Sequence, residues 1–95
     1  MTKEQFKANA SKTIDEVSAK LNEVKAKKEA VKGDAKEKYE RILKGLEDRK
    51  DALEEKYDDL ENAAEHNWEE VKTSFSAASE SFKKGLEELG SIFSK

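Results

Sequence analysis

The 95-residue sequence contains no cysteine, no proline, four glycines and one histidine. The absence of cysteine excludes disulfide bonds and thiolate metal sites, and it leaves the redox compartment open. The absence of proline removes the strongest helix breaker from the chain. No run approaches the about 18 consecutive apolar residues of a membrane span, and the first five residues contain no apolar signal core. We therefore expect a cytoplasmic protein, or a periplasmic one if a leader segment has been removed.

Apolar residues are also scarce, at 35% of the chain against 43% charged residues. A chain of this length and composition forms one domain with a narrow core, and we expect that domain to cover residues 1–95. The apolar residues recur every three or four positions from Phe6 to Phe93, and no alternating stretch marks a strand. This period favours a folded helical bundle over disorder, because disordered chains lack large apolar residues in phase.

Two positions are expected to divide this helical pattern. Gly33 can end a helix, and Asp34 with Glu37 forms a capping box for the next one. Asn67, with Glu70 three residues later, is a weaker start signal for a third helix. We therefore predict an all-α fold, an antiparallel three-helix bundle with helices at about 3–32, 35–65 and 68–93.

An alternative fold lacks the second break. From Ile42 onward, apolar residues recur every eleven positions, which suits one nearly straight helix. The chain would then be a helical hairpin with one long C-terminal helix, and two copies would dimerise as a coiled coil.

The residues expected to anchor the core are Leu46, Leu53, Tyr57, Leu60, Trp68 and Val71.

Charge is unevenly distributed along the chain, whose net charge is −3. Residues 1–33 carry eight Lys and five Asp or Glu, whereas residues 34–65 carry seven Lys or Arg and twelve Asp or Glu. The two segments attract each other if they pack side by side. The densest basic cluster, at residues 25–28, has Glu23 and Glu29 beside it. We therefore expect no nucleic-acid partner.

The sequence offers little for catalysis or metal binding. His66 lies about 200° around the helix from the apolar face, so we expect it to point into solvent. Glu-x-x-His elements, phosphate loops and nucleophile motifs are absent. We predict that the protein is not an enzyme, with no catalytic, cofactor-binding or metal-ligating residue, no cofactor and no evident small-molecule substrate.

Segment 73–95 combines a weakly charged polar face, rich in Ser and Thr, with large apolar residues. Such a combination occurs in helices that bind lipid at packing defects, and it also fits the core side of a third helix. The residues of this candidate interaction or lipid face are Phe75, Phe82, Leu86, Leu89, Ile92 and Phe93.

Two stretches carry a resemblance to a known group of proteins. Residues 67–72, NWEEVK, and residues 81–87, SFKKGLE, resemble small bacterial helical stress-response proteins of the coiled-coil type. The resemblance covers about residues 34–95. In composition the chain is also similar to apolipoprotein-like and desiccation-protein helices. These likenesses imply a stress-related, non-enzymatic role.

The features together predict a helical interaction or structural protein. We expect it to act by self-association or by binding a partner helix of another protein along its apolar stripe. The alternative is a protein that binds lipid or membrane surfaces through residues 73–95.

Overall fold

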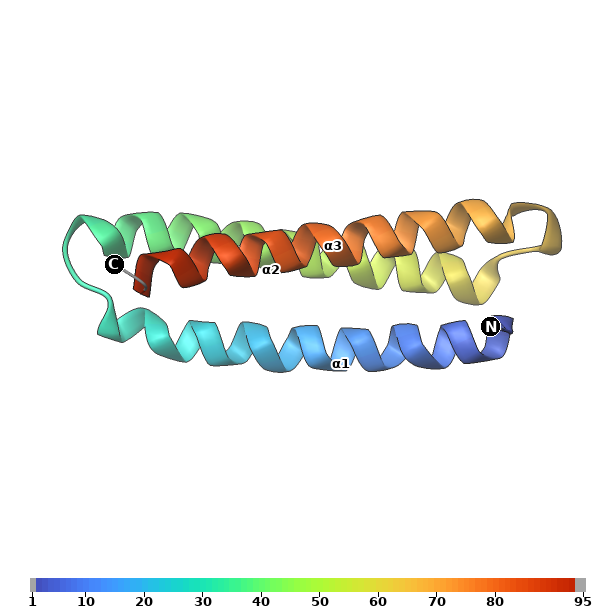
Figure 1. The fold of residues 1–95 in the computed structure, drawn as a ribbon, viewed down its shortest axis with the longest axis horizontal. Coiled ribbons are helices and arrows are strands. Elements are labelled where there is room, and N and C mark those ends of the chain that lie inside the picture. Colours follow the sequence, from blue (N-terminus) through green and yellow to red (C-terminus); the bar gives the residue numbers. More distant parts are fainter. Residues whose placement is uncertain (1, 94–95) are drawn as a thin grey trace.

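The computed structural model describes residues 2–93, apart from the side chain of residue 93, as a bundle of three long helices (Figure 1). Helix α1 spans Lys3–Lys27, α2 spans Asp34–Asn62 and α3 spans Trp68–Phe93. Two short 3-10 turns, η1 (Lys28–Ala30) and η2 (Glu65–Asn67), lie in the connections. Successive helices run antiparallel, so α1 and α3 point in the same direction. The predicted all-α three-helix bundle is confirmed, as a rod of 51 × 18 × 17 Å.

The connection between α1 and α2 differs from the predicted one. Helix α1 ends at Lys27 rather than at residue 32, because Val31 is extended and buries its side chain in the core. Gly33 precedes α2 with φ 68° and ψ −149°, a backbone conformation that is essentially restricted to glycine. Gly33 is the N-cap, so Asp34, which was expected to cap α2, is instead its first residue. The helix start has no side-chain hydrogen bond, so the expected capping box with Glu37 is wrong.

The second break lies close to its predicted position. Helix α2 ends at Asn62 instead of residue 65, because Ala63 adopts an extended backbone conformation. The Asn67 side-chain oxygen accepts a hydrogen bond from the Ala64 N–H at 2.9 Å, and so caps η2 rather than α3. Helix α3 then begins at Trp68. The alternative of one continuous C-terminal helix is wrong.

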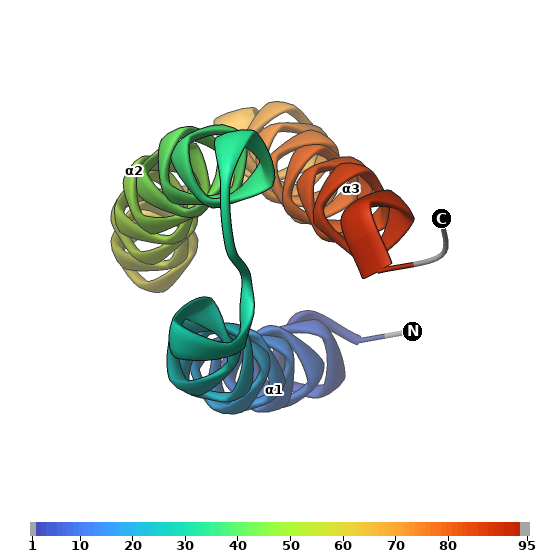
Figure 2. The ribbon, with the colours of Figure 1, turned by 90° about the vertical axis from the view of Figure 1, so that its left-hand side faces the viewer.

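The core is built mainly from α2 and α3. Of the predicted anchors, Leu46, Leu53, Leu60 and Trp68 are buried, whereas Tyr57 and Val71 are half-buried at the edge of the core. The largest fully buried side chains all belong to α2 or α3: Tyr39, Leu46, Leu53, Leu60, Phe82 and Leu89. Helix α1 buries only Ala10, Val17 and Leu21. Viewed along the rod, α2 and α3 lie side by side and α1 lies across from them (Figure 2).

Candidate interaction surface

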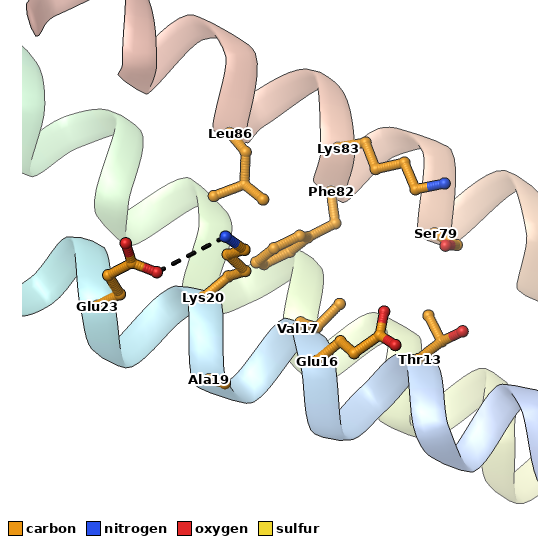
Figure 3. Close-up of a pocket in the computed structure, with 10 residues that line it drawn as sticks. All are labelled: Thr13, Glu16, Val17, Ala19, Lys20, Glu23, Ser79, Phe82, Lys83 and Leu86. Carbon is orange, nitrogen blue, oxygen red and sulfur yellow. Dashed lines mark ion pairs between the residues drawn. The ribbon is translucent and has the colours of Figure 1, made fainter.

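A groove of about 520 Å³ lies between α1 and α3 near the middle of the bundle (Figure 3). Its apolar lining includes Val17 of α1 and Phe82 and Leu86 of α3. Phe82 is fully buried at the bottom of the groove, whereas Leu86 is half-buried at its side. Thr13 and Ser79 lie on opposite sides of it. The size of the groove falls in the range of protein sites that take up apolar groups.

The rim of this groove carries both signs of charge. Glu16, Lys20 and Glu23 of α1 and Lys83 of α3 surround it, so two carboxylates oppose two ammonium groups. Lys20 Nζ lies 3.7 Å from Glu23 Oε2, within the same helix. The rim therefore attracts neither an anionic nor a cationic partner strongly.

Two further hollows continue the groove toward the start of α1. The first, of about 180 Å³, shares Thr13 and Ser79 with the groove. The second, of about 350 Å³, shares Phe6 and Ser76 with the first. The interface between α1 and α3, called the α1–α3 interface below, is thus incompletely filled from the Phe6 end to Leu86.

Aromatic contacts hold the start of α1 against α3. The Phe6 ring meets the rings of Trp68 and Phe75 edge to face, with centroids 5.8 and 6.2 Å apart. Lys3 Nζ lies 5.6 Å from the centre of the Trp68 ring, and Lys72 Nζ lies 6.0 Å from the centre of the Phe6 ring. An aromatic pair contributes about 0.5–1.5 kcal/mol beyond its area burial, and a cation–π contact at an exposed site contributes about 0.5–1 kcal/mol. The contacts at this end of the α1–α3 interface are therefore individually weak.

The other end of α1 is tied to α2 instead. The buried Tyr39 hydroxyl donates a hydrogen bond to the Val24 carbonyl of α1 at 2.5 Å, and burial raises the pKa of that hydroxyl. Lys25 Nζ also lies 3.8 Å from Glu47 Oε2 of α2. These contacts fix the C-terminal end of α1 beside the start of α2.

Ion pairs do not cross the α1–α3 interface in the part of the chain that the structure describes. The pairs that leave α1 run to α2 and to η2. In the η2 pair, Lys3 Nζ lies 2.7 Å from Glu65 Oε1, and this hydrogen-bonded charge lowers the pKa of Glu65. Because Glu65 is exposed, the pair is a weak, salt-sensitive contact.

The interface between α2 and α3, called the α2–α3 interface below, packs more closely at Gly85, although a hollow of about 470 Å³ lies along it beside Gly45 and Glu88. Arg49 Nη1 of α2 donates a hydrogen bond to the Ser81 carbonyl of α3 at 3.0 Å. A Cβ at Gly85 would lie only 2.5 Å from Leu46 Cδ2 and from Arg49 Nη1. The helices approach closely here because position 85 has no side chain.

The structure divides the residues predicted for the candidate interaction or lipid face. Phe75, Phe82 and Leu89 are buried in the core, whereas Leu86 and Ile92 are half-buried. The side chain of Phe93 lies outside the described residues. In the observed closed bundle, most of this face is therefore covered.

Sequence reasoning missed the contribution of α1 to this surface. Thr13, Val17 and Lys20 line the groove, although none belonged to the predicted face. A signal was present in the small size of two of the three buried residues of α1, Ala10 and Val17, which leaves space opposite the large residues of α3.

The described residues show no obvious site for metal chemistry. His66 is exposed, as predicted, but it lies in the η2 turn between α2 and α3 rather than on the polar face of an α-helix. Among residues 2–93, no three His, Cys, Asp or Glu side chains gather so that they could hold a metal ion. No described helix is both long and apolar enough to cross a membrane.

Comparisons with protein-family models, with curated proteins and with solved structures give no match for this chain. The stress-related role implied by the sequence resemblance stays a prediction. The geometry of the helices, above all the contrast between the α1–α3 and α2–α3 interfaces, is what bears on function.

Proposed function

We propose that this chain is a non-enzymatic interaction protein that works by opening. In this proposal α1 separates from the α2–α3 hairpin, starting at its N-terminal end, and the apolar face of α3 becomes the binding surface. The observation that carries the proposal is the incompletely filled α1–α3 interface, which contrasts with the close approach of α2 and α3 at Gly85.

The distribution of buried side chains supports a low free energy for this opening. All the largest fully buried residues lie on α2 or α3, and two of the three buried residues of α1 are the small Ala10 and Val17. Burial of apolar area is the main stabilising contribution, so removing α1 exposes less of it than disrupting the hairpin. Regions with few buried apolar contacts open at a lower free energy than the whole domain.

The contacts at the two ends of α1 give the opening a direction. The N-terminal end is held by an exposed ion pair, Lys3 with Glu65, and by the half-buried Phe6 ring. The C-terminal end is held by the buried Tyr39 hydroxyl and by Val31 in the core. We expect the chain near η1 to act as the hinge because it is the better anchored end.

Native-state amide hydrogen exchange tests this proposal directly. The free energy of opening should be lower for amides in the centre of α1 than for amides in the centres of α2 and α3. Only the centres of the helices are compared, because fraying of helix ends does not contribute there. Equal protection in all three helices would contradict the proposal, because the bundle would then open only as a unit.

A cross-link provides the matched control for that measurement. The natural chain has no cysteine, so Thr13→Cys/Ser79→Cys creates the only two thiols, one on each side of the groove. A short bis-maleimide bridge between them should raise the protection of α1 to the level of the other helices. An unchanged exchange rate in α1 after bridging would show that its amides exchange by some other route than separation from α3.

A further inference from the structure

The face of α3 that turns toward α1 and the core carries its largest side chains in a regular series. Phe75, Phe82 and Leu89 are spaced by seven residues, and Leu86 lies between the last two. Seven residues are close to two helical turns, so these side chains form one strip along the helix. If α1 separates from its N-terminal end, Phe75, which lines the hollow beside Phe6, is uncovered first, and Phe82 and Leu86 follow.

The surroundings of this strip carry almost no net charge. From Thr73 to Ser79 the sequence TSFSAAS contains no charged residue. Farther along α3, Lys83 and Lys84 lie among Glu80, Glu87 and Glu88. The uncovered surface would therefore be apolar along the strip, uncharged with hydroxyl groups around Phe75, and of mixed, slightly acidic charge beside Phe82 and Leu86.

This charge pattern distinguishes between two classes of partner. A partner helix is normally oriented by charged residues that flank its apolar strip, and segment 73–79, around the part of the strip that is uncovered first, offers none. A lipid surface with packing defects needs no such charges. It accepts large apolar side chains, and the Ser- and Thr-rich polar face limits attraction to anionic headgroups.

We infer that the partner of the opened bundle is a lipid surface with packing defects, as on strongly curved membranes, and that α3 lies in its interface through Phe75, Phe82, Leu86 and Leu89. This inference rests on the proposed opening of α1. Binding should follow vesicle curvature rather than vesicle charge, because the surface supplies apolar area and little net charge.

Vesicle flotation with the full chain tests the inference. We expect the bound fraction to be highest on small zwitterionic vesicles, to decline as vesicle diameter increases, and to change little when anionic lipid is added. The bridged Thr13→Cys/Ser79→Cys variant should bind about tenfold less or worse, since its binding-competent state is no longer populated. A bridge containing a disulfide allows reductant to restore binding in the same sample.

A second bridge controls for the chemistry of cross-linking. Arg41 and Glu88 line one hollow between α2 and α3, and replacing both leaves the net charge unchanged. The bridged Arg41→Cys/Glu88→Cys variant should bind vesicles like the natural chain, because α1 remains free to open. Equal binding by the bridged Thr13→Cys/Ser79→Cys variant would overturn the inference, since α3 would then not be the surface used.

The inference and the proposed function fail in different ways. If hydrogen exchange shows that α1 opens but no vesicle of any size is bound, the lipid inference is wrong and the opened face serves a protein helix, from a second copy or another chain. If α1 does not open, both are wrong. Strong binding only to anionic vesicles of every size would also overturn the inference, because charge would then be the driving term.

Discussion

The α2–α3 and α1–α3 interfaces share one helix but differ in how their side chains meet. At the α2–α3 interface, Gly85 lets the helices approach, and Arg49 reaches the Ser81 carbonyl. At the α1–α3 interface, hollows of about 180 to 520 Å³ remain, and no ion pair joins the two helices within the described residues. The difference underlies the proposed opening of α1, because it places the closer packing on one side of α3.

The largest expected effect compares the same truncation on two helices. Leu53→Ala in α2 should destabilise the bundle by about 2–5 kcal/mol, because it leaves a cavity in the closed part of the core. Leu21→Ala in α1 should cost about 2 kcal/mol or less, since α1 can shift into the unfilled interface. Urea unfolding monitored by circular dichroism gives both values. His66→Ala is the exposed control and should stay within about ±0.5 kcal/mol. A larger cost for Leu21→Ala would reverse the comparison.

A pair of glycine substitutions tests how closely α2 and α3 approach. Gly85→Ala should destabilise the bundle by up to about 2 kcal/mol, because overpacking against the Leu46 and Arg49 side chains, about 1–3 kcal/mol, is offset by about 1 kcal/mol of helix propensity. Gly45→Ala meets no atom within 4 Å and should stabilise α2 by about 0.5–1 kcal/mol through its helix propensity. Thermal melts of both variants measure this. The same sign for both changes would mean that the α2–α3 interface is looser than the geometry indicates.

The hydroxyl that ties α1 to α2 should have a smaller effect. Tyr39→Phe removes the bond to the Val24 carbonyl and should cost about 1 kcal/mol, with increased exchange in the last turns of α1. Because the pKa of Tyr39 is raised in the fold, its contribution is full below the unfolded pKa of about 10 and is lost as pH rises through the folded value. Tyr57→Phe, at a half-buried site, is the control. If both variants unfold alike at alkaline pH, the loss of stability at high pH does not come from Tyr39.

The smallest effect concerns the ion pair at the start of α1. The pKa of Glu65 is lowered by Lys3, so the pair stabilises the fold above the ordinary carboxyl pKa and loses its effect as pH falls through the lowered value. Lys3→Gln should return the pKa of Glu65 toward its ordinary value and slightly increase exchange in the first turns of α1. An NMR titration of Glu65 checks the first point, with Lys7→Gln as control. An unmoved pKa would show that Lys3 does not contact Glu65 in solution.

Periodicity was a good guide to which residues face inward and a poor guide to how helices end. Leu46, Leu53 and Leu60 follow one another at seven-residue intervals, and all three are fully buried. The first helix nevertheless stops five residues early, because burying Val31 outweighs continuing the helix. Such a choice depends on a tertiary contact that local sequence does not contain.

The candidate surface could be predicted only in part, again because some of it depends on tertiary contacts. The strip of large apolar residues on α3 was readable from residue spacing, whereas its covering by α1 and the hollows beside Val17 were not. Spacing gives the direction of each side chain around its own helix. It does not give the distance to the next helix, which depends on the volumes of all side chains that meet there.

The sequence by itself determined that this chain forms amphipathic helices, that one break lies near residue 33, and which side of α3 is apolar, because these properties depend on backbone propensity and on a 3.6-residue period. The tertiary structure decided between a second break near residue 67 and one continuous C-terminal helix. Only the tertiary structure decided that Gly85 rather than Gly45 marks the closed interface and that α1 leaves its interface with α3 unfilled. Two glycines in similar helical contexts become different only when a neighbouring helix fixes what lies within reach of each Cα.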